Sequence, residues 1–297
     1  MAPASEIHTP VLASEVLACL QPRTSGLYVD GTLGLGGHGE ALLAASAPAG
    51  RLIGFEWDRE AADLACRRLA PFGDRFFLVE ASYADMRTEL QRLRIGKIDG
   101  LLVDLGVSSL QLDSMERGFS FRADAPLDMR MDRRLPRTAA DLVATLSEEE
   151  LADIFYHYGE ERQARRIARF LVRARQEAPV TSTARLAEIV ARAVPRRFHP
   201  RKIHVATRVF QGLRIAVNRE LDNLVRLLQD APSFLAPGAR ICIITFHSLE
   251  DRIVKRAFGS DGAWQVITRR PVEPSAEEIR ANPRARSARL RVAERTA

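Results

Sequence analysis

The sequence has few cysteines, and their spacing argues against the usual cysteine-based sites. Cys19, Cys66 and Cys242 lie far apart and share no Cys-x-x-Cys spacing. Neither a zinc site nor a disulfide framework is therefore indicated, and we predict no bound metal. Cys242 lies within an apolar strand pattern, where we expect a small buried side chain.

Long hydrophobic runs are also missing. No apolar run approaches the roughly 18 residues that span a bilayer, and residues 1–8 lack the basic start and apolar core of a secretory signal. The 297 residues, 46% hydrophobic and 28% charged, are ordinary for a globular protein of one large or two smaller domains. We expect a cytoplasmic protein without membrane contact.

The excess of positive charge is confined to one segment. The net charge is +6, but residues 159–214 alone carry 14 Lys and Arg against 4 Glu, a local +10 that leaves about −4 for the rest. An acidic partner is therefore expected at this segment.

Glycine is concentrated in one stretch, residues 28–43, where an apolar strand start precedes an acid, a glycine run and a helix pattern. Five glycines between Gly31 and Gly39 let the backbone turn with positive φ and lie directly against a ligand. The following helix would point its N-terminal N–H groups at this loop, which favours an anionic group there.

Two cofactor classes fit this loop. Gly34-x-Gly36-x-x-Gly39 matches the dinucleotide fingerprint, which is weak evidence alone. Asp30, four residues before Gly34, would repel a pyrophosphate but would pair with an ammonium beside a carboxylate. The methionine part of S-adenosylmethionine (SAM) has both groups, so we favour SAM over NAD.

Apolar strand patterns alternate with amphipathic helices through the first third of the chain. Strands are expected at residues 27–30, 51–56, 75–80 and 98–105, with helices at 59–69 and 84–93. This alternation predicts a parallel sheet with ligands beyond the carboxyl ends of its strands. Two final strands, at 264–270 and 288–292, would form an edge hairpin. The pattern is typical of the α/β, Rossmann-like sheet of SAM-dependent methyltransferases.

Polar residues follow the predicted strands at that edge. Asp30, Glu56 and Asp104 end three strands, and the third strand runs into Tyr83. Glu56 lies 20 residues after Gly36, the distance at which an acid accepts hydrogen bonds from ribose hydroxyls. Tyr83, or Asp85 nearby, would border an adenine ring.

Between the two sheet segments, residues 1–112 and 207–297, we predict a helical insertion over residues 113–206. Its helices are expected at 147–157, 160–176 and 182–194, and the sheet segment resumes with a long helix over 207–228 and a strand over 240–246. His247, directly after that strand, has a structural reading and a substrate-contact reading.

Arginines form a stripe on the helix predicted at 160–176, beside its apolar stripe. A charged stripe is usually a solvated face, but few acids interleave here and more cations follow. We therefore predict salt-dependent contact with nucleic-acid phosphates. The candidate RNA-binding residues are Arg162, Arg165, Arg166, Arg169, Arg173, Arg196 and Arg197.

Several long strings resemble one family in a single order along nearly the whole chain. They include residues 8–12 (HTPVL), 30–32 (DGT), 36–38 (GGH), 96–100 (GKIDG), 104–109 (DLGVSS), 111–113 (QLD), 116–121 (ERGFSF), 126–132 (PLDMRMD), 158–162 (YGEER), 246–252 (FHSLEDR) and 282–287 (NPRARS). On these strings the chain resembles the RsmH (MraW) family of bacterial methyltransferases.

The resemblance implies methyl transfer from SAM to the N4 amino group of a specific cytosine in the decoding region of 16S rRNA, in the small (30S) ribosomal subunit. It also implies cofactor contacts from Gly36, Gly37, His38, Glu56, Tyr83, Asp104 and Gln111. The sequence departs from the family's usual Asp at Glu56 and its usual Phe at Tyr83. As a catalytic hypothesis, Asp104 or the backbone of residues 106–109 accepts an N4 hydrogen.

Two other classes stay open at this point. One is a NAD-dependent oxidoreductase, and the other is a basic RNA-binding ribosome-assembly factor with a vestigial cofactor loop. The sequence also leaves open a homodimer, and whether naked RNA or the assembled subunit is the substrate.

Overall fold

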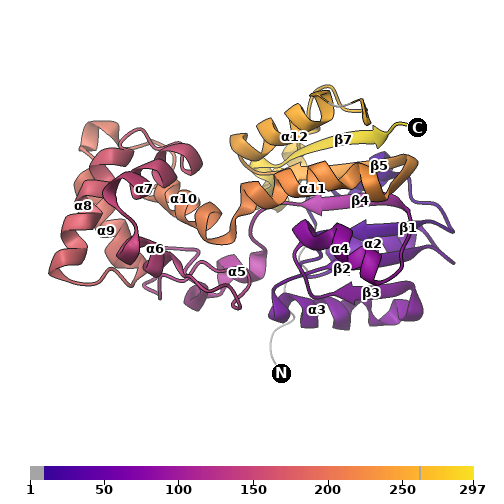
Figure 1. Cartoon of the computed structure of the whole chain (residues 1–297), viewed down its shortest axis with the longest axis horizontal. Helices are drawn as coiled ribbons and strands as arrows, with labels where there is room; N and C mark the ends of the chain where they lie inside the picture. The colour runs from indigo at the N-terminus through magenta and orange to yellow at the C-terminus, as the bar shows by residue number, and fades with distance from the viewer. Residues whose placement is uncertain (1–9, 261) are drawn as a thin grey trace. The chain divides into compact units, whose positions relative to one another are not determined.

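The computed structural model describes residues 10–260 and 262–297, so the first two residues of the 8–12 string lie outside the described residues. The chain divides into two compact units (Figure 1). The sheet unit comprises the chain up to Gly106 and from Leu221 onward, and the helical unit is Val107–Glu220. Each unit is described by itself.

A seven-stranded sheet in the order β3-β2-β1-β4-β5-β7-β6 forms the sheet unit. The strands β3, β2, β1, β4 and β5 are parallel, and β7 runs antiparallel to β5. The predicted Rossmann-like sheet is therefore confirmed. The strands are β1 (Leu27–Asp30), β2 (Arg51–Phe55), β3 (Phe76–Val79), β4 (Ile98–Asp104), β5 (Leu235–Thr245), β6 (Trp264–Val266) and β7 (Arg289–Arg295).

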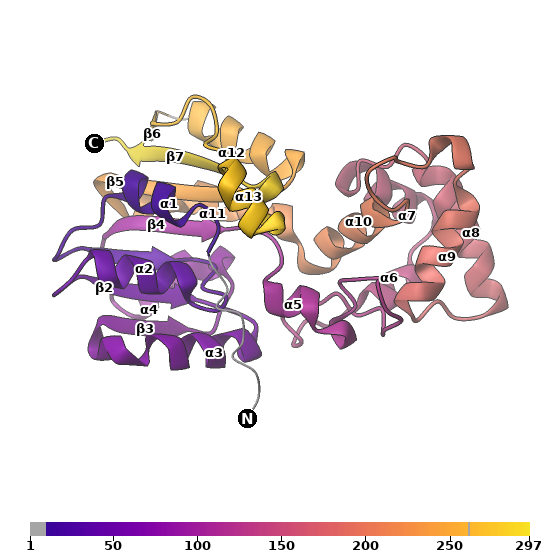
Figure 2. The ribbon, with the colours of Figure 1, turned by 180° about the vertical axis from the view of Figure 1, so that it is seen from behind.

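Helices cover both faces of this sheet because successive strand residues point to opposite sides. Val29 and Ile53 pack with α4, α11 and α12, whereas Tyr28 and Leu52 pack with α1, α2 and α3. Figure 1 shows α4 and α11 in front of the sheet, and Figure 2, seen from behind, shows α1 and α2 on its other face. The bounds are α1 (Ala13–Leu20), α2 (Gly37–Ala45), α3 (Arg59–Leu69), α4 (Met86–Arg92), α11 (Glu220–Phe234), α12 (Ser248–Ser260) and α13 (Ala276–Ala281), with short 3-10 turns η1 (Ala70–Arg75), η2 (Tyr83–Asp85) and η6 (Pro283–Ser287).

The two final strands pair as predicted. β6 joins β7 antiparallel, with Trp264 opposite Arg295, and it forms the edge of the sheet. β7 lies between β6 and β5, so its first residue, Arg289, stands opposite Thr245 where β5 ends. The start of β7 therefore lies at the same sheet edge as the carboxyl ends of the parallel strands.

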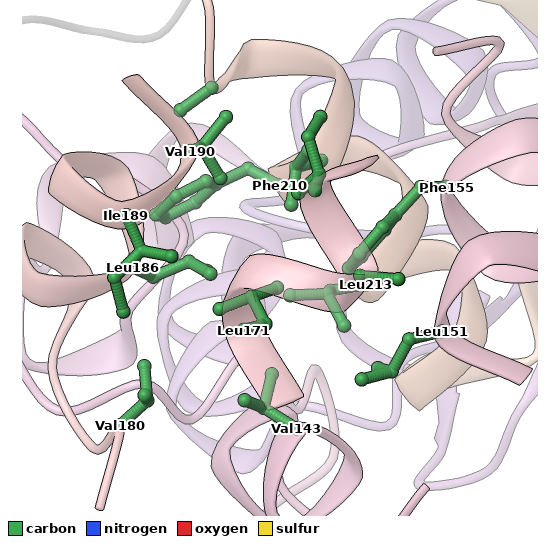
Figure 3. Packing of buried hydrophobic residues seen from close by; sticks show 14 of the residues in the cluster. Val143, Leu151, Phe155, Leu171, Val180, Leu186, Ile189, Val190, Phe210 and Leu213 are labelled. Carbon is green, nitrogen blue, oxygen red and sulfur yellow. The ribbon is translucent and has the colours of Figure 1, made fainter. Parts of the chain in front are cut away.

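The helical unit has its own hydrophobic core, part of which Figure 3 shows. Phe155, Leu171, Leu186 and Leu213 are fully buried in it and come from four different segments. The elements are α5 (Ser109–Asp113), η3 (Met115–Arg117), α6 (Ala139–Thr145), α7 (Glu148–Asp153), the π-helical turn η4 (Ile154–Tyr158), α8 (Ala164–Glu177), α9 (Thr183–Ala193), η5 (Arg196–Phe198) and α10 (Thr207–Asn218).

Sequence signals account for several of these boundaries. The predicted capping box at Ser147 opens α7, since its side chain accepts from Glu150 N and Glu150 accepts from Ser147 N. Thr138 and Asp141 make the same arrangement at α6, a helix that the sequence analysis missed. α8 starts at Ala164 and not at 160, because Glu160 has a φ of 50° that no α-helix accommodates.

The predicted long helix over 207–228 is wrong. Arg219 adopts a left-handed φ of 52° and ends α10 before α11 begins. Val209, Phe210 and Leu213 on α10 pack into the core of the helical unit. The helical unit therefore runs to Glu220, and it starts at Val107, whereas the sequence placed these boundaries at 206 and 113.

Membrane-spanning helices, metal-binding groups and cysteines were also considered from the sequence. Within residues 10–260 and 262–297, no helix combines the length and apolarity that a bilayer crossing needs. The same residues contain no group of three His, Cys, Asp or Glu side chains arranged to hold a metal ion. Cys242 is fully buried in β5, and all three thiols are free.

Gly159 allows a backbone-to-backbone approach between η4 and α10, which gives a stability prediction. A Cβ at Gly159 would lie closer than contact distance to the carbonyl oxygen of Arg208 and 2.7 Å from that of Phe155. We expect Gly159→Ala to lower the free energy of unfolding by about 2 kcal/mol or more, measured by urea denaturation.

Gly96→Ala is the control, because a Cβ at Gly96 meets nothing within 4 Å. It should change the free energy of unfolding by less than about 0.5 kcal/mol. Equal stability of both variants would contradict the close crossing of η4 and α10.

Candidate active site

The carboxyl ends of β1 and β4 bring Asp30 and Asp104 to one edge of the sheet. The two strands are parallel neighbours, and Asp30 pairs with Leu102, two residues before Asp104. Two hydrogen bonds connect the loop after β1 to β4. Gly31 N donates to Leu102 O (2.8 Å), and Asp104 N donates to Thr32 Oγ1 (2.6 Å). Thr32 thus fixes the backbone from which the Asp104 side chain projects.

The glycine loop leads directly into the N-terminus of α2. Gly34 and Gly36 have φ values of 53° and 80°, which β-carbon-bearing residues rarely adopt. Gly36 is the N-cap of α2 and no side chain caps this end, so backbone N–H groups of the first turn are available to an anion. Farther along the turn, a Cβ at Gly39 would lie 2.9 Å from Leu52, so glycine also permits close packing of α2 on the sheet.

Among the residues that the structure describes, four buried side-chain atoms have no hydrogen-bond partner. Three of them belong to this site, Asp30 Oδ2, His38 Nε2 and Asp104 Oδ1, and the fourth is His247 Nε2, after β5. His38 Nε2 lies 3.6 Å from Asp104 Oδ2, beyond hydrogen-bond distance. Buried polar atoms are nearly always satisfied in proteins, so three unsatisfied ones together indicate a place for a polar ligand. Two of the three belong to carboxylates, which favours a ligand that carries a positive charge or donates hydrogen bonds.

The Asp30 carboxylate is buried, and its neighbours compensate only part of the cost of that burial. Its Oδ1 accepts from Thr32 N (3.1 Å), and its side chain is almost completely buried. Burial raises the pKa of Asp30 to about 6, against the lowering influence of His38 and of the Thr32 N–H group. A bound cation would relieve this cost by favouring the ionised form.

Glu56, after β2, uses both carboxylate oxygens within the site. Its Oε2 accepts from Gly34 N (2.8 Å) and its Oε1 accepts from Asp58 N (2.8 Å). Burial raises the pKa of Glu56 to about 7, although these two N–H groups act in the opposite direction. Glu56 therefore supports the glycine loop, and each oxygen retains a second lone pair for a ligand hydroxyl.

Two aromatic rings lie at the ends of β2 and β3. Trp57 and Tyr83 have ring centroids 6.4 Å apart at an interplanar angle of 46°. Asp85, the alternative to Tyr83, forms an ion pair with Arg226 at 3.0 Å. No role is expected for Trp57 from the sequence, in which its position next to Glu56 is its only signal.

Gln111 and His247 take part in helix capping. Gln111 Oε1 accepts from Ser108 N and Gln111 N donates to Ser108 Oγ, a capping box at α5 in the helical unit. Its cofactor contact stays a prediction. In the sheet unit, Glu250 Oε2 accepts from His247 N (3.3 Å), and Glu250 N lies 3.5 Å from His247 Nδ1. These contacts give His247 a structural role at the start of α12. Its buried Nε2 lies 3.1 Å from Glu250 Oε1 but makes no hydrogen bond with the described residues, so the contact with substrate stays a prediction.

The predicted arginine stripe divides into two groups in the structure. Arg166 donates from Nε to Ala193 O, and Arg169 forms an ion pair with Glu148 at 3.4 Å. Arg197 lies over the ring of Phe198. In the described part of the helical unit, no ion pair is found for the exposed Arg162, Arg165, Arg173, Arg196 and Arg197.

Comparison with known proteins identifies related sequences. A profile of the MraW methylase family matches residues 5–296. The chain is 56% identical over 294 residues to the ribosomal RNA small subunit methyltransferase H of Desulfotalea psychrophila, covering 98% of this chain and 99% of the relative. Proteins of the same name from Cyanothece sp. (52% over 289 residues, 97% and 95% coverage) and Syntrophus aciditrophicus (51% over 306 residues, 97% of both) are also similar.

The buried carboxylate of Asp30 generates a pH-dependent stability prediction. Because the folded-state pKa of Asp30 is raised, the unfolded chain loses this proton first, and stability falls as pH rises from about 4 to about 6. We expect Asp30→Asn to remove this loss. Relative to the original protein, the variant should gain up to about 3 kcal/mol of unfolding free energy across this window, measured by urea denaturation without ligand.

Asp63→Asn serves as the control, because Asp63 is exposed on α3. Its difference from the original protein should stay constant with pH. A pH-independent difference for Asp30→Asn as well would mean that Asp30 is not buried as the structure places it.

Proposed function

The chain belongs to the MraW methylase family, and from this premise we propose that it transfers the methyl group of SAM to the N4 amino group of a specific cytosine in the decoding region of 16S rRNA, within the small ribosomal subunit. The relatives' names support ribosomal RNA of the small subunit as substrate. The observation that carries the proposal is the cluster of unsatisfied atoms on Asp30, His38 and Asp104 beside an uncapped helix N-terminus.

The residues at the sheet edge fit the functional groups of SAM. The carboxylates of Asp30 and Asp104 suit the ammonium, and the backbone N–H groups at Gly37 and His38 suit the methionine carboxylate. The remaining lone pairs of Glu56 suit ribose hydroxyls. The ring of Tyr83, with Trp57 beside it, supplies an apolar border for adenine.

When bound, SAM supplies an electrophilic methyl group on a sulfonium that leaves as a neutral thioether. The chain's own residues then have to place the acceptor nitrogen in line, about 3 Å from the methyl carbon. The N4 lone pair of cytosine is delocalised into the ring, so an acceptor for an N4 hydrogen assists its pyramidalisation. Asp104 suits this role because its Oδ1 has no hydrogen-bond partner within residues 10–260 and 262–297 and because Thr32 holds its backbone.

RNA contact is proposed for the helical unit, together with extrusion of the target base from its stack. The exposed arginines of α8 lie on the opposite side from its buried residues Ile167, Leu171 and Ala174. Arginines without an intramolecular carboxylate keep their full attraction for phosphate oxygens.

Methyl transfer is tested with labelled SAM and small ribosomal subunits that lack the modification, followed by nucleoside analysis. We expect label in N4-methylated cytosine. Binding of NAD(H) without binding of SAM would instead favour the oxidoreductase. RNA binding with no transferred label would favour the assembly factor.

Asp104→Asn is the informative variant in this assay. It retains the shape of the side chain but weakens its acceptor strength, so we expect kcat to fall about 100-fold or more. Asp74→Asn, the same change at an exposed position before β3 and so at the opposite edge of the sheet, should leave kcat unchanged. Full turnover by Asp104→Asn at normal SAM affinity would remove the acceptor role.

The exposed arginines of α8 predict how RNA binding depends on salt concentration. Replacing Arg165 and Arg173 with Glu should weaken RNA binding and reduce the slope of log K against log salt concentration by about 0.7 to 0.9 per lost phosphate contact. SAM affinity should stay unchanged by calorimetry. Arg166 and Arg169 are left intact, because each already makes an intramolecular contact in the helical unit.

The matched control replaces Arg51 and Arg94 with Glu. Both residues are exposed. Arg51 is the first residue of β2 and Arg94 precedes β4, so they lie at the opposite edge of the sheet from the candidate site. An equal loss of RNA affinity in this control would show that net charge, and not the α8 surface, governs binding.

A further inference from the structure

The segment that joins α9 to α10 combines exposed apolar side chains with cations. We call residues 195–204 the basic-aromatic loop; its sequence is PRRFHPRKIH, with four Lys or Arg and no acid. Phe198 is 49% exposed and Ile203 41% exposed. Large apolar side chains that remain in water among charges of one sign indicate a recognition surface when they form a group.

Contacts within the helical unit fix the conformation of this loop. His199 Nε2 lies 3.0 Å from Val194 O, and Phe198 N donates to Pro195 O (2.8 Å). At the other end, the ring of His204 packs on that of Phe121 with centroids 4.8 Å apart. The exposed Phe198 ring is therefore presented by a turn fixed at both ends, which lowers the entropy cost of binding through it.

The charges of the loop are available to a partner. Arg196, Arg201 and Lys202 are exposed, and none forms an ion pair with any residue that the structure describes. The guanidinium carbon of Arg197 lies 4.9 Å from the centre of the Phe198 ring. A planar guanidinium beside an aromatic ring forms a surface on which a nucleobase can stack.

We propose that the Phe198 ring, together with the Arg197 guanidinium, stacks on an unpaired base of single-stranded RNA, while Arg196, Arg201 and Lys202 contact flanking phosphates. This inference rests on the proposed function, and it adds base stacking to the phosphate contacts expected for the helical unit. Stacking requires a base with a free face, so the loop distinguishes single strands from duplexes.

A protein partner fits the loop less well. Two exposed apolar side chains fall far below the roughly 1,000 Å² of buried surface that a stable protein interface needs. The core of such interfaces is depleted in Lys, whereas here four cations surround the apolar pair within ten residues. A polyanion with aromatic bases matches both features.

The experiment measures binding of a fluorescent, unstructured RNA of about 12 nucleotides and of a duplex of the same length, over a series of salt concentrations. We expect Phe198→Ala to weaken single-strand binding about 10-fold without changing the salt slope, and to leave duplex binding unchanged. Phe198→Tyr should bind like the original protein, because it keeps the ring. Phe198→Leu keeps apolar area but has no aromatic face, so it should bind like Phe198→Ala.

Two controls separate stacking from charge and from exposed apolar area. Replacing Arg201 and Lys202 with Gln should lower the salt slope for both RNAs. Tyr156→Ala removes another aromatic residue of the helical unit that is 59% exposed, and it should have no effect.

The proposal is overturned if Phe198→Leu binds single strands as well as Phe198→Tyr, since apolar contact would then be sufficient, as for a protein partner. It is also overturned if Phe198→Ala changes nothing, or if the original protein does not bind the single strand. Methyl transfer to small subunits, measured in parallel, distinguishes these outcomes from failure of the proposed function. A variant that loses stacking but still methylates leaves the proposed function intact.

Discussion

The candidate site depends on one buried carboxylate, that of Asp30 at the end of β1. Its Oδ1 accepts a hydrogen bond from Thr32 N, but Oδ2 has no partner in the described part of the chain, and burial raises the pKa of Asp30 to about 6. An isolated folded chain would be more stable with an apolar residue here. The sheet therefore maintains an unfavourable charge at the point where a cationic ligand would compensate it, which is how functional sites commonly differ from the rest of a fold.

The surrounding backbone is arranged so that this charge stays in place. Thr32 both donates to Asp30 and accepts from Asp104, so a single residue connects the two acids through the loop between them. Glu56 holds Gly34 from the neighbouring strand. The loop is rich in glycine, yet hydrogen bonds connect it to the ends of three adjacent strands. Its positive φ angles therefore allow the backbone to approach a ligand closely and do not make the loop mobile.

The sequence predicts well whatever is determined locally. Apolar runs located the strands, α3 has the bounds expected from its periodicity, and the capping box at Ser147 marks the start of α7. The errors arose where tertiary contacts decide. The left-handed turn at Arg219 interrupts a continuous amphipathic pattern, and the packing of α10 on the helical core moves the unit boundary. Likewise, sequence spacing placed Glu56 at the site but did not predict that its Oε2 accepts from Gly34 N, because that partner lies 22 residues away in the loop after β1.

The roles of charged residues are even harder to predict from the sequence. The arginines of α8 look equivalent in the sequence, but their surroundings assign them different roles. Arg166 donates a hydrogen bond to the carbonyl oxygen of Ala193 at the end of α9, and Arg169 forms an ion pair with Glu148. Arg165, in contrast, is exposed to solvent. An arginine already paired with a carboxylate has less attraction to offer a phosphate, because that pair has to be broken or shared. Nucleic-acid affinity in the helical unit therefore depends on where acids are absent, and the longest acid-free basic segment is the one that also presents an aromatic ring.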